Sequence, residues 1–265
     1  MEILTPLPKN RKSVKAALFD FDGTLSTLRC GWEAVMAPLM VETLLGGEPD
    51  GGEAAREVSE YIDASTGIQT IFQMQWLSER VKARGRTPGD PWEYKAEYNR
   101  RLMRTVALRR EAVEQGRESA GRYLIAGSRA LLEALAGRGL TLYVASGTDQ
   151  ADVTKEAEIL GLAGYFREIA GAPAGVASCS KERVIRALLG ECGLSGEELV
   201  VVGDGKVEIA IAREAGALAL GVASDEEARQ GINPVKRQRL LDAGAHAITG
   251  DFTNLDEILG WLGLG

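Results

Sequence analysis

Two carboxylates, two residues apart, carry the clearest chemical signal in this chain. Asp20 and Asp22 follow an apolar run, 16–19, that predicts a buried strand, and Gly23 and Thr24 come next. In α/β folds, reactive groups collect at the carboxyl ends of parallel strands. Two aspartates at this spacing can share a divalent cation while one attacks an electrophile and the other moves a proton. A simple polar turn would use the same residue types, so the pair needs partners elsewhere.

A serine and a glycine follow a second apolar stretch, 140–145, that also predicts a strand. Behind them, 149–160 predicts a helix that begins at an acidic cap, Asp149. A hydroxyl and free backbone N–H groups at the start of a helix form a ready anion site. Ser146 and Gly147 are therefore candidate phosphate contacts. Ser146 could also cap the helix, and the two roles are compatible.

Lys181 opens a predicted amphipathic helix over 181–192. A cation in the first turn of a helix is unfavourable with respect to the helix dipole, so its position calls for a partner. It could neutralise a carboxylate and a bound anion together. The ordinary alternative is a lysine that points to solvent.

A second pair of acidic residues follows the apolar stretch 199–202. Asp204 lies between two glycines after this predicted strand, and Glu208 comes one helical turn later. The two pairs would form an acidic cluster whose mutual repulsion a hard cation relieves, and oxygen ligands beside a phosphate suit Mg²⁺. The predicted magnesium ligands are Asp20, Asp22, Asp204 and Glu208.

From residue 127 to the C-terminus the sequence alternates between apolar runs and amphipathic stretches with short connections. This alternation is typical of a parallel sheet covered by helices on both faces. We predict an α/β fold with a Rossmann-like parallel-sheet core in three layers, α/β/α. The predicted strands are 16–19, 140–145, 165–170, 199–202, 217–222 and 245–249. The predicted helices are 128–138, 149–160, 181–192, 207–215, 234–243 and 255–262.

Residues 26–126 differ, because they contain helical stretches and no convincing strand. Turns rich in glycine and proline punctuate them at 46–52 and 85–90. The predicted helices are 32–45, 53–65, 68–84, 91–108 and 109–123. The chain thus divides into an α/β core, 1–25 and 127–265, and an α-helical bundle of roughly 100 residues, 26–126, inserted after its first strand.

Composition limits the classes of function. The 265 residues carry a net charge of −7, which gives no support to nucleic-acid binding. No apolar run approaches the ~20 residues of a membrane span, and 1–15 lacks the apolar core of an export signal. Three cysteines without Cys-x-x-Cys spacing favour neither a disulfide framework nor a zinc site. We expect a cytoplasmic monomer or homodimer, in which the single histidine, His246, is structural.

The motifs occur in a fixed order between Asp20 and Glu208: Asp-x-Asp-Gly-Thr, a serine after a strand, a lysine that opens a helix, and Gly-Asp followed by an acid. This set resembles the haloacid dehalogenase superfamily, and the resemblance covers nearly the whole chain. A helical insertion between the first two motifs resembles the phosphoglycolate phosphatase and β-phosphoglucomutase branch, which carries a mobile cap domain there.

The resemblance implies a role for each motif residue. Asp20 is the nucleophile that becomes an aspartyl phosphate, and Asp22 is the general acid for the leaving group and then the base for water. Ser146 and Lys181, with Gly147 beside the serine, hold the phosphoryl group. The implied ligands of Mg²⁺ are Asp20, the backbone carbonyl of Asp22, Asp204 and, directly or through a bound water, Glu208.

Two residues of the last motif depart from the family pattern. The motif often ends in aspartate, whereas this chain has Glu208, whose longer side chain can reach a metal-bound water. Lys206, in the same loop, would lie near the anion or, as we favour, point to solvent.

The sequence favours a Mg²⁺-dependent phosphatase acting on a small phosphorylated metabolite, such as a sugar phosphate or a phosphoglycolate-like compound. A phosphomutase of the β-phosphoglucomutase type is the enzymatic alternative, and a non-catalytic binding protein on the same fold is the other. Within 80–110, ten basic residues face three acidic ones. One or two of these arginines could attract an anionic substrate, although a solvated helix face is the ordinary interpretation. Three tryptophans are candidates for the site or for the bundle core: Trp32, Trp76 and Trp92.

Overall fold

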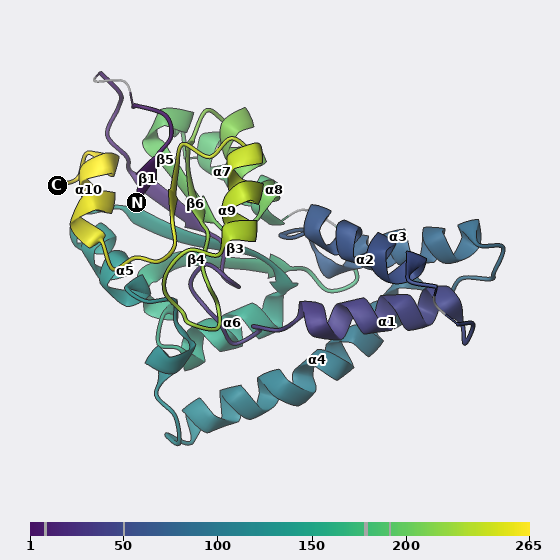
Figure 1. Ribbon diagram of the computed structural model, residues 1–265. Helices are drawn as coiled ribbons and strands as arrows, with labels where there is room; N and C mark the ends of the chain where they lie inside the picture. The colour runs from purple at the N-terminus through teal and green to yellow at the C-terminus, as the bar shows by residue number, and fades with distance from the viewer. Residues whose placement is uncertain (8–9, 50, 178–179, 191) are drawn as a thin grey trace.

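A seven-stranded sheet forms the centre of the molecule in the computed structural model, which describes residues 1–7, 10–49, 51–177, 180–190 and 192–265 (Figure 1). The strand order is β1-β7-β6-β5-β2-β3-β4, and every neighbouring pair is parallel except β1 with β7. The strands are β1 (Glu2–Ile3), β2 (Ala16–Phe19), β3 (Thr141–Asp149), β4 (Phe166–Ala172), β5 (Leu199–Gly203), β6 (Leu218–Val222) and β7 (Ala247–Thr249). The predicted parallel sheet is confirmed, and the short antiparallel strand β1 is an addition to it.

Helices cover both faces of this sheet. One layer consists of α5 (Ser128–Gly137), α6 (Gln150–Ile159) and α10 (Leu255–Leu262), and the other of α7 (Ser180–Gly190), α8 (Lys206–Glu214) and α9 (Pro234–Asp242). Side chains of β2 pack against the helices on both faces: Ala17 and Phe19 lie in one apolar core, and Ala16 and Leu18 lie in the other. The predicted three-layer α/β/α architecture is confirmed.

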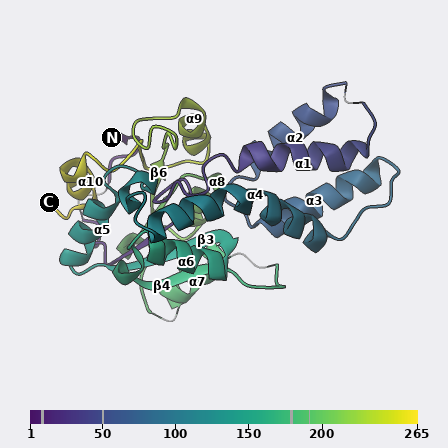
Figure 2. The ribbon, with the colours of Figure 1, turned by 90° about the horizontal axis from the view of Figure 1, so that it is seen from below.

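The helices between β2 and α5 form a separate layer that extends away from the sheet, on the side opposite the two chain termini (Figure 2). They are α1 (Glu33–Leu45), α2 (Glu53–Ala64), α3 (Thr70–Ala83) and α4 (Pro91–Glu114). Their own core contains Met40, Val58, Met74 and Leu77, all fully buried. We call α1–α4 with their connecting loops the helical insertion.

The predicted helices 91–108 and 109–123 are not separate, because one long helix, α4, crosses the predicted break. The sequence suggested a break between 91–108 and 109–123, but α4 continues to Glu114 and is followed by a short 3-10 helix, Ala120–Tyr123. Nothing at Arg109 stops a helix, whereas Gly116, with φ of 68°, adopts the left-handed conformation that ends one. At its start, Asp90 accepts a hydrogen bond from the backbone N–H of Trp92 and Pro91 occupies the first turn.

The position of β2 determines where chemistry can occur. It lies between β3 and β5, with Phe19 level with Val144 and Val202. The segments that follow these strands therefore meet at one edge of the sheet, and the helical insertion begins there. The backbone N–H of Asp20 donates to the carbonyl of Val202 at 2.9 Å, which fixes the first residue beyond the strand.

Three smaller expectations can be compared with the structure. No helix in the described ranges is both long and apolar enough to cross a membrane. Cys30 and Cys192 are free thiols, and Cys179 lies outside the described residues. The Nδ1 atom of His246 accepts a hydrogen bond from the backbone N–H of Ala219 at 3.0 Å, which is a structural role at the start of the last strand.

Candidate active site

Asp20 and Lys181 face each other at the carboxyl edge of the sheet. The Nζ atom of Lys181 lies 3.0 Å from Oδ1 of Asp20, and the two side chains are only 4% and 7% exposed. Lys181 also contacts Glu208 and donates to the carbonyl of Gly67, in the helical insertion, at 2.9 Å. The lysine that opens α7 is therefore directed at the site, and its unfavourable place in the helix is offset by two carboxylates.

Burial raises the pKa of Asp20 to about 7, against the opposing charge of Lys181 and with further help from the charges of Asp204 and Asp22. Burial likewise raises the pKa of Asp22 to about 6, with Arg29 opposing the rise. Asp22 can thus hold a proton more readily than an exposed aspartate does. This property suits a group that donates a proton to a leaving oxygen.

Asp22 is oriented by the last residues of β3, beyond Ala145. The hydroxyl of Thr148 donates to Oδ2 of Asp22 at 2.8 Å, and that of Ser146 lies 3.4 Å from the same oxygen. The other oxygen, Oδ1, has no hydrogen-bond partner among the described residues, although Nε of Arg29 is 3.9 Å away. Thr148 lies two residues beyond Ser146, and its contact with Asp22 was not predicted from the sequence.

Ser146 and Gly147 lie in the irregular last part of β3. The hydroxyl of Ser146 accepts a hydrogen bond from the backbone N–H of Thr148 at 3.0 Å, so it holds this segment as well as facing Asp22. Gly147 packs against the helical insertion so closely that a Cβ atom there would lie 2.8 Å from the carbonyl oxygen of Ile68. A glycine is needed at this position for the insertion to close on the sheet edge.

Asp204 is held by a lysine that sequence analysis missed. The Nζ atom of Lys236, on α9, lies 2.7 Å from Oδ2 of Asp204 and 2.7 Å from Oε1 of Glu226. Burial works to lower the pKa of Lys236, but the two acids outweigh it and raise that pKa above its usual range. Lys236 lies in the first turn of its helix, so the signal that identified Lys181 would also have identified it.

Glu208 lies apart from the aspartates. It is 2% exposed, and Lys181 separates it from Asp20 by contacting both. Its second oxygen, Oε2, is buried without a hydrogen-bond partner among the described residues. Glu208 is therefore the second carboxylate that contacts Lys181, and its predicted place beside the magnesium ion, directly or through a bound water, stays a prediction.

The remaining acids fit a magnesium ion. The charges of Asp204 and Asp22 both act to raise the pKa of Asp20, and a divalent cation would relieve that repulsion. Within the described ranges, no three acidic, histidine or cysteine side chains converge as a complete ligand set. The ion would therefore take two carboxylates, Asp20 and Asp204, with main-chain and water oxygens, and Mg²⁺ commonly binds in this way.

Arg29 connects the start of the helical insertion to the core. Its guanidinium makes two hydrogen bonds to Glu156, from Nε at 3.1 Å and Nη2 at 2.7 Å, and Glu156 is completely buried. Nη2 also lies 3.3 Å from Asp152 on the same helix, α6. Arg29 gave no signal in the sequence, because its partners lie more than a hundred residues away.

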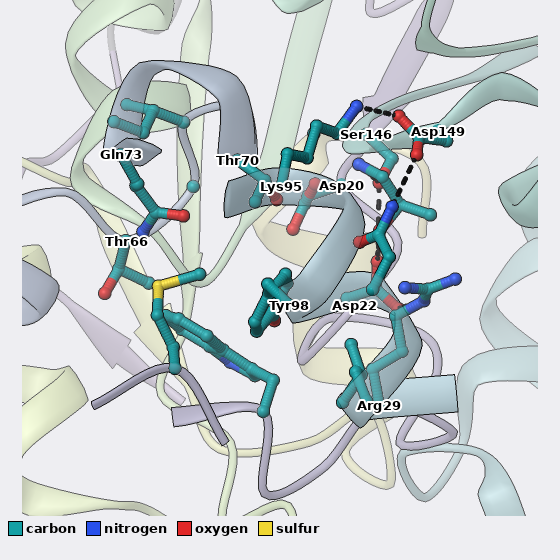
Figure 3. A pocket seen from close by; sticks show the side chains of 18 of the residues that line it. Asp20, Asp22, Arg29, Thr66, Thr70, Gln73, Lys95, Tyr98, Ser146 and Asp149 are labelled. Atoms are coloured by element: carbon teal, nitrogen blue, oxygen red, sulfur yellow. Dashed lines mark hydrogen bonds and ion pairs between the residues drawn. The ribbon is translucent and has the colours of Figure 1, made fainter. Parts of the chain in front are cut away.

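Asp149 is the N-cap residue of α6, as expected, but its side chain has another role. Its side chain makes no capping hydrogen bond and instead contacts Lys95 and, at 3.0 Å, Asn99 on α4. These contacts join the core to the helical insertion across the site, as the dashed lines of Figure 3 show.

A cavity of about 100 Å³ lies between the sheet edge and the helical insertion. Asp20, Asp22 and Ser146 line it from the core, and Tyr98, Lys95 and Thr70 from the insertion (Figure 3). The sequence-predicted residues Gly147, Lys181 and Asp204 line it as well. This volume lies below the ~300–1,000 Å³ of typical small-molecule pockets, so the space suits a small ligand.

The arginines of 80–110 do not reach this cavity, so their suggested role in attracting substrate is wrong. Of the ten basic residues only Lys95 lines it. Arg100 and Arg101 both pair with Glu97, one turn away on α4. Lys206, the other cation in question, is 37% exposed and lies 3.6 Å from Asp63 on α2.

Of the candidate tryptophans, only Trp32 lines the cavity. Trp76 stacks on Tyr61 at a ring-centroid distance of 3.8 Å, inside the helical insertion. Trp92 lies beside Lys95, whose ammonium is 5.3 Å from the ring centroid.

Comparison with curated proteins finds two partial matches. The chain is 28% identical over 142 residues to a phosphoglycolate phosphatase from Rhodospirillum rubrum, which covers 54% of this chain and 55% of that protein. It is 35% identical over 92 residues to a 5'-nucleotidase from Pseudomonas aeruginosa, which covers 35% of this chain and 42% of that protein. The chain thus spans about half the length of the curated relatives it matches, or less.

Solved structures share the whole fold. A predicted phosphoglycolate phosphatase from Haemophilus somnus superposes with a TM-score of 0.59 at 19% identity, covering 93% of this chain and 98% of that one. A putative β-phosphoglucomutase from Thermotoga maritima superposes with a TM-score of 0.56 at 18% identity, covering 93% and 99%. At these identities the likeness shows the fold alone.

A family model covers most of the chain. The model of the haloacid dehalogenase-like hydrolases matches residues 14–216, a stretch that contains all four motifs and the helical insertion. The chain therefore belongs to the haloacid dehalogenase-like hydrolases.

Proposed function

We propose that this protein is a Mg²⁺-dependent phosphatase that hydrolyses a small phosphate monoester through an aspartyl phosphate on Asp20. The observation that carries the proposal is the meeting of Asp20, Asp22 and Lys181 in one small cavity at the carboxyl edge of the sheet. In this proposal, 1–25 and 127–265 form the catalytic core, and 26–126 forms a cap.

Each residue has a distinct task. The carboxylate of Asp20 attacks phosphorus while Asp22 gives its proton to the departing ester oxygen, which leaves as an alcohol. Water then attacks the phosphorus of the aspartyl phosphate, Asp22 takes a proton from that water, and Asp20 is released with inorganic phosphate. Lys181 and Ser146 hold the phosphoryl oxygens during both steps.

Asp20, Asp204 and the backbone carbonyl of Asp22 would hold Mg²⁺. Its charge would offset the repulsion between the carboxylate of Asp20 and a phosphate dianion. Glu208 positions Lys181 in this account, and Lys236 positions Asp204. The raised pKa of Asp22, caused chiefly by burial, favours the protonated form that the first step needs.

Release of inorganic phosphate from phenyl phosphate tests the proposal. We expect activity with Mg²⁺, its loss in EDTA, and a fall in kcat of about 10³-fold or more in Asp20→Asn, as for other catalytic nucleophiles. Asp242→Asn, at an exposed aspartate near the end of α9, is the matched control and should keep wild-type activity. Turnover that survives both EDTA and Asp20→Asn would contradict the proposal.

A phosphomutase using the same aspartyl phosphate is the alternative. It would convert one sugar phosphate into its isomer without releasing inorganic phosphate, and would need a sugar bisphosphate as activator. Formation of an isomerised sugar phosphate without inorganic phosphate would favour the mutase over the phosphatase.

A further inference from the structure

The positive charges around the cavity are already neutralised. Of the described residues that line it, three are cationic, and each contacts a carboxylate: Arg29 contacts Glu156, Lys95 contacts Asp149, and Lys181 contacts Asp20 and Glu208. In the proposed function, Lys181 also binds the phosphoryl group. A carboxylate or second phosphate on the leaving group would therefore have no cation of its own, and burying an unpaired charge is strongly unfavourable.

Besides Oδ1 of Asp22, the hydroxyl of Tyr98 is a polar group of the cavity without a hydrogen-bond partner among the described residues. The side chain of Tyr98, on α4, is 4% exposed and lines the cavity, yet its hydroxyl makes no hydrogen bond to any described residue. Figure 3 shows it in the middle of the site, between Thr66 and Arg29 and below Lys95. Burial raises the pKa of Tyr98 above its usual range, so the hydroxyl keeps its proton. Because this hydroxyl lines the cavity, a ligand atom there could accept a hydrogen bond from it.

Part of the cavity wall is apolar. Trp32, Met36 and Leu102 line the same cavity from α4 and from the N-terminal part of the insertion, and the latter two are almost completely buried. Such side chains favour carbon atoms of a ligand over its charged groups. The volume of about 100 Å³ limits how many atoms can fit.

From these observations we propose that the leaving group is a small alcohol without a negative charge. Its carbon atoms contact Trp32 and Met36, and a hydroxyl or ether oxygen accepts a hydrogen bond from Tyr98. This inference rests on the proposed phosphatase function and narrows its substrate. It separates this protein from an enzyme for phosphoglycolate, whose leaving group is a carboxylate-bearing alcohol, and from one for a sugar bisphosphate.

Two phosphate esters of matched size test the charge preference: 2-hydroxyethyl phosphate, whose leaving group is neutral, and 2-phosphoglycolate, whose leaving group is anionic. We expect kcat/KM for the neutral ester to exceed that for the anionic ester by about tenfold or more, since an unpaired negative charge in the cavity is costly. A kcat/KM for 2-phosphoglycolate equal to or above that of the neutral ester would overturn the inference.

Tyr98→Phe tests the hydrogen bond. We expect kcat/KM for 2-hydroxyethyl phosphate to fall about five- to tenfold, mainly through a higher KM, which is the size of one neutral hydrogen bond. Phenyl phosphate has no second oxygen on its leaving group, so its kcat/KM should change less than about twofold. The matched control is Tyr94→Phe on the same helix, whose hydroxyl accepts the backbone N–H of Gly89 at 2.6 Å and does not line the cavity.

The outcomes separate the inference from the proposed function. If phenyl phosphate is hydrolysed and Tyr98→Phe affects both esters equally, the hydrogen bond is wrong while the phosphatase function stands. If phenyl phosphate is hydrolysed and 2-phosphoglycolate is preferred, the leaving group without a negative charge is wrong. If no ester is hydrolysed with Mg²⁺ present, the proposed function fails and the substrate class fails with it.

Discussion

The ammonium of Lys181 lies 3.0 Å from Oδ1 of Asp20 while also contacting Glu208. This arrangement joins the end of strand β2 to the first turns of α7 and α8. It keeps a positive charge beside the carboxyl group that must approach a phosphate dianion. Glu208, although outside the aspartate cluster, thus influences where that charge lies.

Glu208→Gln should therefore weaken catalysis without touching the substrate. It leaves Lys181 buried with one carboxylate in place of two, so we expect the free energy of unfolding to fall by about 3 kcal/mol and kcat/KM for phenyl phosphate by about tenfold. Urea denaturation and steady-state kinetics measure the two effects. Glu214→Gln, at an exposed position in the same helix, is the control. A kcat/KM for Glu208→Gln within twofold of wild type would show that Lys181 does not need Glu208 to keep its position.

Arg29 and Glu156 should be strongly coupled in stability. Removing the guanidinium in Arg29→Met leaves a completely buried carboxylate without its main partner, and we expect a loss of about 3–5 kcal/mol in the free energy of unfolding. The double variant with Glu156→Leu should lose clearly less than the sum of the two single variants. Arg110→Met is a useful control, because Arg110 lies 3.9 Å from the same carboxylate and is 18% exposed. If the losses in the free energy of unfolding of the two single variants simply add in the double variant, Arg29 and Glu156 do not act as a coupled pair.

Gly147→Ala should interfere with closure of the helical insertion. The new methyl group would lie 2.8 Å from the carbonyl oxygen of Ile68, so the loop at Ile68 would have to move. We expect KM for phenyl phosphate to rise several-fold while the thermal stability of the protein changes little. Gly190→Ala, where a Cβ meets no atom within 4 Å, is the matched control. Unchanged kinetics in Gly147→Ala would mean that this close contact is not needed for activity.

His246 should titrate below its usual range. Burial, and then the charge of Arg213, lower its pKa, so the folded protein holds the imidazole neutral more firmly than the unfolded chain does. The stability that depends on the neutral form is present above pH ~6.5 and is lost as the pH falls through the folded-state pKa. Because His246 is the only histidine, one imidazole NMR signal reports the midpoint.

Comparing the urea stability of wild type with that of His246→Gln across the same pH range isolates this contribution. The wild type should lose stability relative to the variant as the pH falls below ~6.5. A midpoint at or above the usual value of the imidazole would contradict the assignment.

The sequence was sufficient for the architecture and for the residues at the strand ends. Asp20, Ser146 and Asp204 each follow an apolar run, and in a parallel sheet with β2 between β3 and β5 such residues meet at one edge. Placing these residues at one edge of the sheet requires only the period of the apolar pattern and the lengths of the connections. The pairing of Arg100 and Arg101 with Glu97 could also have been predicted, because these residues are three and four positions apart on one helix.

The rest depended on contacts between distant segments. Arg29 and Glu156 are 127 residues apart in the sequence, and Lys181 and Gly67 are 114 apart. No local sequence pattern therefore predicts either contact. Tyr98 lies on a helix whose amphipathic pattern does not say which face meets the core. Its position in the cavity follows from how the helical insertion packs on the sheet edge, through contacts such as that of Asp149 with Asn99.

The most direct measurement of the central claim is to look for the phosphoryl group on Asp20. Turnover of phenyl phosphate carrying a radiolabelled phosphorus, in the presence of Mg²⁺, is stopped with acid, and the labelled peptide is identified by mass spectrometry. We expect the label on the peptide that contains Asp20, and no labelled peptide from Asp20→Asn. Full turnover with no label on Asp20, or with the label on another residue, would contradict an aspartyl phosphate at this position.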